Sequence, residues 1–191
     1  MNIIAVFHGA KVEGLEGLPA EISANPPMTV EGMEKMWRRI SGNEFSPHLP
    51  SSLGNKIDAI YSSRLARALD TASVIALHLN LEITTVSELG QMANKDGNTV
   101  THYPGHEKDD VILWQKNAMF AVRKIVSRHA DHHTVVAVSH RPIIAGIVAW
   151  AIDKIGDANV LNKILNDPGF GKDGYFAFRT NGEHATGDYP L

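Results

Sequence analysis

The chain has 191 residues, of which 43% are hydrophobic and 20% charged, a composition typical of a soluble globular protein. It contains no cysteine, which excludes disulfides, thiolate metal sites and a cysteine nucleophile, and its net charge of -3 argues against a broad nucleic-acid-binding face. We therefore expect a single domain over residues 1–191, a cytoplasmic location, and neither a nucleic acid nor a membrane as partner.

The N-terminal segment ends a predicted strand with a titratable side chain. Residues 3–7 are five consecutive apolar residues, which predicts a short strand buried on both faces. His8 and Gly9 follow directly. Ligands of open α/β sheets bind at the carboxyl ends of the strands, and a glycine there permits a sharp turn and a close approach. His8 is therefore either a structural histidine at a strand end or a catalytic one.

Strands and amphipathic helices alternate along the rest of the chain, which predicts an α/β fold. Residues 10–27 are rich in glycine and proline and are expected to form a loop beside His8. The other predicted strands are 57–61, 81–86, 134–138 and 175–178, the last of them at an edge of the sheet. The predicted helices are 30–40 after a cap at Thr29, 64–79 after a cap at Ser62 or Ser63, 107–128, 143–155 and 158–165. The final dozen residues are polar, and we expect them to be loose.

Two arginines lie at the N-terminal end of the predicted helix 64–79, where the helix dipole disfavours cations. Arg64 and Arg67 are one turn apart, and the free backbone N–H groups of a helix N-terminus also bind anions. The pair is consistent with an anion bound nearby. The alternative is that Arg67 pairs with Asp70 on a solvated face.

A second apolar strand also ends in a histidine. Residues 134–138 lead to Ser139, His140 and Arg141, and Pro142 suits the first turn of the helix that follows. At the end of the predicted strand 81–86, Glu88 is either an ordinary exposed carboxylate or an acid held in a pocket.

Three further histidines close the long predicted helix 107–128. His129, His132 and His133 could be metal ligands, but positive side chains at a helix C-terminus explain them more simply. We therefore expect no metal.

Two histidines, a pair of arginines and a carboxylate at strand ends in one sheet can bind a phosphate and act on it. Neutral imidazole can attack phosphorus to give phosphohistidine, and arginine holds phosphate oxygens. A carboxylic acid can protonate the leaving oxygen. No metal or other cofactor is needed where cationic side chains supply the charge. The expected partner is phosphate or a small phosphorylated substrate.

Five segments, in order, resemble the histidine phosphatase superfamily, also called the phosphoglycerate mutase-like family. They are Phe7-His8-Gly9, Pro27-Met28-Thr29 with Gly32, the stretch SSRLARALDTA over 62–72, Tyr103-Pro104-Gly105-His106-Glu107, and Val136-Ala137-Val138-Ser139-His140. This resemblance covers nearly the whole chain. It implies a three-layer α/β/α sandwich with a mostly parallel central sheet.

The resemblance also implies roles for individual residues. His8 would be the nucleophile that becomes phosphorylated, Arg67 would grip the phosphate, and His140 would stabilise the transferring group. Glu88 lies near the place of the family's proton donor, and Glu107 is the second candidate for that role.

Four positions depart from the family's pattern, and two of them, His106 and Lys108, replace small residues of the segment around Gly105. Phe7 stands where the family has an arginine, and Arg141 stands where it usually has a glycine. We expect Gly9 to belong to the phosphate site, and Arg141, Arg64 or Lys11 to restore the missing positive charge.

Three functions remain open at this point. The presence of His8, Arg67 and His140 favours a phosphomonoester hydrolase that works through phosphohistidine. Phe7 favours a weakened or inactive relative that binds a phosphorylated ligand or a protein partner. A phosphoglycerate mutase ranks third, because the chain is shorter than expected of that branch.

Overall fold

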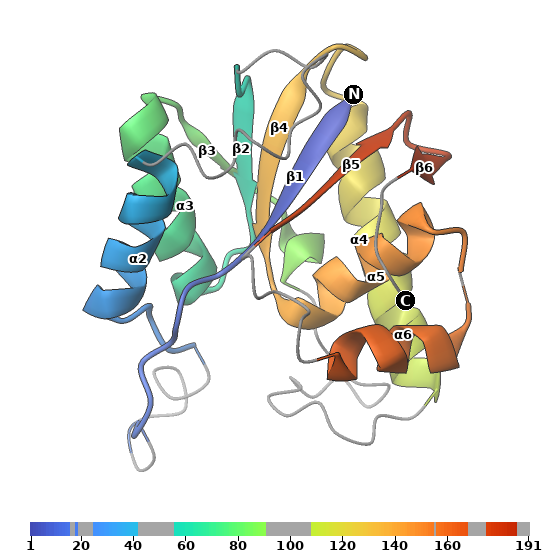
Figure 1. The fold of residues 1–191 in the computed structure, drawn as a ribbon, viewed down its shortest axis with the longest axis horizontal. Helices are drawn as coiled ribbons and strands as arrows, with labels where there is room; N and C mark the ends of the chain where they lie inside the picture. Colours follow the sequence, from blue (N-terminus) through green and yellow to red (C-terminus); the bar gives the residue numbers. More distant parts are fainter. Residues whose placement is uncertain are drawn as a thin grey trace.

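A six-stranded mixed sheet forms the centre of the protein, in the order β3-β2-β4-β1-β5-β6 (Figure 1). The computed structural model describes residues 1–15, 18, 25–41, 56–90, 108–154, 156–167 and 175–186, with only the backbone described for residues 108–111. The strands are β1 (Asn2–Phe7), β2 (Ala59–Ser62), β3 (Ile83–Thr85), β4 (Thr134–Ser139), β5 (Tyr175–Thr180) and β6 (Ala185–Thr186). The first four in the sheet order are parallel, whereas β5 runs antiparallel to β1 and β6 antiparallel to β5. The predicted mostly parallel sheet is confirmed.

Strand β1 lies inside the sheet and is buried on both faces, as its unbroken apolar run predicts. It pairs with β4 on one side, where Ile4 lies opposite Val136, and with β5 on the other. Because successive side chains point to opposite faces, Ile3 and Ala5 enter one hydrophobic core while Ile4 and Val6 enter the other.

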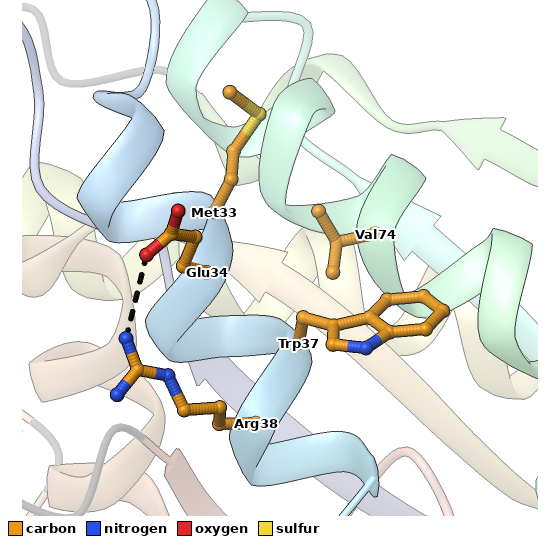
Figure 2. Close-up of a pocket in the computed structure, with 5 residues that line it drawn as sticks. All are labelled: Met33, Glu34, Trp37, Arg38 and Val74. Atoms are coloured by element: carbon orange, nitrogen blue, oxygen red, sulfur yellow. Dashed lines mark hydrogen bonds and ion pairs between the residues drawn. The ribbon is translucent and has the colours of Figure 1, made fainter.

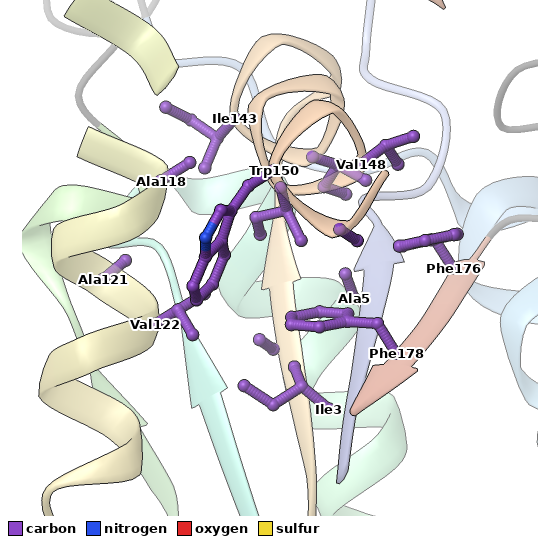
Figure 3. Close-up of a cluster of buried hydrophobic side chains, with 14 of the residues drawn as sticks. Ile3, Ala5, Ala118, Ala121, Val122, Ile143, Val148, Trp150, Phe176 and Phe178 are labelled. Atoms are coloured by element: carbon purple, nitrogen blue, oxygen red, sulfur yellow. The ribbon is translucent and has the colours of Figure 1, made fainter. Parts of the chain in front are cut away.

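Helices cover both faces of the sheet and complete the three predicted layers (Figure 1). The helices are α2 (Val30–Ser41) and α3 (Ala66–Leu79) on one face, and α4 (Lys108–Val126), α5 (Arg141–Ala151) and α6 (Ala158–Asn166) on the other, with a short 3₁₀ helix η2 (Ser87–Leu89) after β3. The larger core lies on the α4–α5 side. There the Trp150 ring packs between α5 and α4, with its centroid 6.5 Å from that of Phe178 (Figure 3).

Local chemistry sets the ends of the helices. The Thr29 hydroxyl accepts the Gly32 N–H and caps α2 as predicted, and Pro142 lies in the first turn of α5. The predicted start of α3 was two residues too early. Its first residue, Ala66, donates its N–H to the Asn25 side chain, while Ser63 Oγ accepts the Leu65 N–H just before the helix.

Two predictions for the C-terminal part were wrong. Strand β5 lies between β1 and β6 rather than at an edge. The edge position belongs to β6, whose two residues lie in the segment expected to be loose. A two-residue strand is too short to give an alternating pattern, so its pairing with β5 had no signature in the sequence.

Candidate active site

His8 stands at the carboxyl end of β1, where the backbone turns away at Gly9. Its Nδ1 donates a hydrogen bond to the Gly9 carbonyl at 2.8 Å, which leaves the lone pair on Nε2. Burial lowers the pKa of His8 to about 4, and the positive charges of Arg67 and Lys11 lower it as well. The hydrogen bond to Gly9 raises the pKa, but its effect is smaller than that of burial. The imidazole is therefore neutral near pH 7, with Nε2 available as a nucleophile.

Arg67 reaches the same nitrogen from the first turn of α3. Its side chain is buried, and its Nε donates to His8 Nε2 at 3.2 Å. The alternative considered for it was a solvated pair with Asp70. The Asp70 carboxylate accepts the Met28 N–H at 2.8 Å, so this carboxylate fastens the loop between β1 and α2. A guanidinium beside a neutral imidazole is a suitable partner for an anion that approaches Nε2.

His140 joins the cluster from the carboxyl end of β4. Its ring is fully buried, and its centroid lies 4.9 Å from that of His8. Burial holds the pKa of His140 well below its ordinary value, and the nearby His8 and Arg67 lower the pKa further. Its Nε2 is 2.9 Å from Ser63 Oγ, whereas its Nδ1 is buried without a hydrogen-bond partner among the described residues. An orphaned buried nitrogen is costly unless a ligand completes it.

Thr71 and Ser63 support the three charged or titratable side chains and were not predicted as site residues. Thr71 Oγ1 accepts the Gly9 N–H at 2.9 Å and lies 2.8 Å from the Arg67 carbonyl oxygen, to which it donates. The sequence could have indicated Thr71 as a site residue, because it follows Arg67 by four residues and this spacing places both on one face of the helix. Ser63 was predicted only as a cap of α3, and its contact with His140 joins positions 77 residues apart.

Two glycines allow the segments of the site to pack closely. A Cβ at Gly9 would lie 2.1 Å from the Met28 sulfur, and a Cβ at Gly90 would lie 2.5 Å from Ser63 Oγ. Gly9 therefore belongs to the site through close packing, and its N–H is directed to Thr71.

The comparisons with known proteins identify the family. The model of the histidine phosphatase superfamily (branch 1) matches residues 8–118. The chain belongs to this superfamily. The resemblance predicted from the five segments is confirmed. No curated protein matches the chain.

Solved structures of low identity share the superfamily's fold. YhfR of Bacillus stearothermophilus is 20% identical with a TM-score of 0.69, over 97% of this chain and 94% of that one. A mycobacterial glucosyl-3-phosphoglycerate phosphatase complexed with VO3 is 16% identical with a TM-score of 0.60, over 100% and 97%. A phosphoserine phosphatase of Entamoeba histolytica, in complex with 3-phosphoglyceric acid, is 18% identical with a TM-score of 0.56, over 98% and 95%.

The other candidate cations are placed differently around the candidate site. Arg141 donates from Nε to the Leu165 carbonyl and from Nη2 to the Asp167 carbonyl, so its guanidinium caps the end of α6. Arg64 is exposed and precedes α3. Lys11 lies next to the site, since it forms a bridge with Met28 and its charge contributes to the lowered pKa of His8. Like Arg64, Lys11 is exposed, so of the three candidates only Arg141 has its guanidinium engaged elsewhere by the bonds given above.

Of the two candidate proton donors, the structure describes Glu88 but not Glu107. Glu88 lies in η2, where Lys124 Nζ donates to its carboxylate at 3.1 and 3.2 Å and Ser87 Oγ at 3.0 Å. Burial alone would raise the pKa of Glu88, but hydrogen bonds from its own backbone, Lys124 and Ser87 hold the pKa below its ordinary value. Such a carboxylate is ionised near pH 7 and has no proton to give. Glu107 lies outside the described residues.

Phe7 extends the hydrophobic core to the border of the site. Its side chain is half-buried and packs against the larger core, on the same side as Ile3 and Ala5. An arginine at this position would add a positive charge beside His8, which the phenyl ring cannot supply.

The histidines at the end of α4 form a separate cluster. His129 Nε2 is 2.7 Å from the Tyr61 hydroxyl, and His129 Nδ1 is 3.1 Å from His133 Nδ1. Among the described residues, no group of three or more potential ligands could hold a metal ion, and no helix is long and apolar enough to cross a membrane.

Proposed function

We propose that the protein is a phosphomonoester hydrolase that acts on a small phosphorylated substrate through a phosphohistidine at His8. The observation that carries this proposal is the pairing of His8 Nε2 with Arg67 Nε at 3.2 Å, with Nδ1 engaged by the Gly9 carbonyl. This arrangement fixes a neutral nucleophilic nitrogen beside a cation that can hold the phosphate oxygens.

The reaction uses the residues in two steps. In the first, the phosphate oxygens take over the Arg67 N–H from Nε2, the freed Nε2 lone pair attacks phosphorus, the ester P–O bond breaks, and the leaving oxygen takes a proton from a carboxylic acid. In the second, water attacks the phosphohistidine and gives its proton to that carboxylate, and the P–N bond breaks to release inorganic phosphate and neutral His8. Arg67 and His140 stabilise the negative charge on the transferring group.

Ser63 prepares His140 for this role. When the Ser63 hydroxyl donates to Nε2, the ring proton resides on Nδ1, the nitrogen that has no described partner. An N–H at that position donates to a phosphate oxygen and satisfies the buried group. The phosphatases among the structural neighbours support this reaction class, and one of them was solved with VO3.

Phe7 favours a second candidate function, the binding of a phosphorylated ligand with little turnover. The loss of one charge-assisted contact in a closed site costs about 3 kcal/mol of transition-state stabilisation, or about two decades in rate. Binding of the ground state depends less on that contact, so a site disabled in this way still recognises phosphate.

Phosphate release separates the two functions. We would assay an aryl phosphate and a panel of phosphorylated metabolites, with a chelator present, for the parent protein, His8→Ala, Phe7→Arg and the control Phe7→Leu. We expect turnover by the parent, its loss in His8→Ala, a gain of about a hundredfold or more in Phe7→Arg, and no gain in Phe7→Leu. An inactive parent with an active Phe7→Arg would favour the binding function. Turnover that survives His8→Ala would contradict both.

The general acid is tested by isosteric amides. Glu107 is our proposed donor, because the described contacts hold Glu88 ionised. Glu107→Gln should lower kcat about a hundredfold for an alkyl phosphate and much less for an aryl phosphate, whose leaving group needs no proton. Glu88→Gln is the matched comparison, and the same substrate-dependent loss there would move the role to Glu88.

A further inference from the structure

Helices α2 and α3 present an apolar surface to solvent on the side away from the sheet. We define the α2–α3 face as Val30, Met33 and Trp37 of α2 with Val74 and Leu77 of α3. Val30 is 67% exposed, Leu77 76% and Trp37 44%, so these two helices carry three of the five large apolar side chains that are exposed among the described residues. Met33 and Trp37 lie over α3 beside Val74 and line a shallow groove of about 330 Å³ (Figure 2).

Charges on α2 are divided along the helix. Glu31 and Glu34 lie in its N-terminal half, Lys35 lies at its middle, and Arg38 and Arg39 lie in its C-terminal half. Glu34 and Arg38 line the same groove on the side away from α3, and both are well exposed, at 62% and 75% of their side chains (Figure 2). They make an ion pair of 3.4 Å with each other, and such an exposed pair is easily exchanged for another partner.

This division makes the helix complementary to an antiparallel copy of itself. When two copies of α2 run in opposite directions about a two-fold axis, the acidic half of each lies against the basic half of the other, and their dipoles are also antiparallel. A parallel partner helix of the same charge pattern would place like charges together.

We propose that the α2–α3 face binds a second copy of this chain in an isologous dimer, with the two α2 helices antiparallel. We place the two-fold axis at the height of Met36 along the helix. Glu34 of one copy then lies opposite Arg38 of the other, since each is two residues along the chain from that height. The two Trp37 side chains are then displaced by only about 3 Å along the helix direction, at a rise of about 1.5 Å per residue. Each indole contacts the other beside the grooves, and the charged pairs form the rim.

Charge exchange tests this pairing directly. We would follow the parent by sedimentation velocity at low salt from about 1 µM to about 500 µM. We expect a concentration-dependent dimer, and we expect Glu34→Arg or Arg38→Glu alone to raise its dissociation constant about tenfold or more, because each substitution occurs twice and opposes like charges. An equimolar mixture of the two variants should restore dimers, because the two arginines of one copy, at positions 34 and 38, then face the two glutamates of the other copy.

The mixture also shows whether the two variants are folded. A misfolded variant would not form dimers with the other variant, so restored dimers mean that the single variants failed to dimerise because of their charges. Phe120→Ala removes an exposed aromatic residue of α4 outside the face and should leave the dimer unchanged. A parent that stays monomeric over the whole range would overturn the proposal. So would a dimer that persists in both single variants, or one that the mixture does not restore, because the contact would then use another surface or another segment of the chain.

Discussion

At the scale of single residues, the neutral state of His8 links the proposed chemistry to stability. In an unfolded chain an imidazole titrates near pH 6.5, whereas in the fold the pKa of His8 is about 4. Between these values the unfolded state binds more protons, so the free energy of unfolding rises with pH. The contribution is present above about pH 6.5 and is lost as the pH falls toward 4, by about 3 kcal/mol at that end.

His8→Asn removes this titration. We expect the free energy of unfolding of the variant to depend less steeply on pH between 4 and 6.5 than that of the parent, as measured by urea denaturation at several pH values. Because the pKa of His140 is lowered too, part of the slope remains. The same substitution at the exposed His184 controls for loss of an imidazole. An unchanged slope in His8→Asn would show that the native pKa is not lowered.

Sequence reasoning located His8, Arg67 and His140, which the structure brings together, but not the side chains around them. His8, Arg67 and His140 stand at the ends of regular elements, so strand-end rules and the motifs placed them in one site. The contact of Ser63 with His140 depends on the tertiary arrangement of two strands. The direction of Arg141 toward the end of α6 and the pairing of Glu88 with Lys124 arise in the same way, and no local pattern encodes them.

At the scale of elements, Thr71 couples helix α3 to the turn after β1. Thr71→Val leaves the Gly9 N–H without its acceptor while keeping the side-chain volume. We expect a loss of about 1–3 kcal/mol in the free energy of unfolding. We also expect kcat to fall, because the Gly9 carbonyl orients His8. Urea denaturation and phosphate release would measure the two effects.

Two further variants give this prediction its controls. Thr71→Ser keeps the hydroxyl and should recover most of the stability and rate. Ser73→Ala removes an exposed hydroxyl of the same helix that makes the same kind of bond, to the Leu69 carbonyl, and should change neither. Equal losses in Thr71→Val and Ser73→Ala would mean that the bond to Gly9 contributes nothing.

The helices, which have a periodic apolar pattern, were predicted close to their observed positions. The strand β6, which is defined only by its pairing with β5, was not predicted. The apolar stripes located the five α-helices of the described residues, and the Thr29 cap was right because its bond lies within four residues. The boundary of α3 was displaced because Asn25, 41 residues earlier, provides the acceptor for its first N–H. The position of β5 depends on β6, which is too short to be predicted.

At the scale of the whole molecule, the two cores share one sheet, so we expect them to unfold together. Trp150→Ala removes the ring that joins α5 to α4 and to Phe178. We expect it to cost about 3–5 kcal/mol and to leave one transition by circular dichroism and fluorescence. Phe120→Ala, at an exposed position, should change stability by less than about 0.5 kcal/mol. Separate transitions for the two probes would show that the layers unfold independently.

The position of β1 in the sheet also bears on synthesis. Among the described residues, β1 pairs with residues 134–139 of β4 and 175–179 of β5, so both of these neighbours are translated more than 120 residues after β1. Its apolar run stays exposed for that time and is a target for chaperones and for aggregation. Contacts between residues so far apart in the sequence also slow folding, and β1 with the adjoining His8 depends on such contacts. A nascent chain that ends before residue 134 therefore has no strand β4 to hold His8, however well its helices have formed.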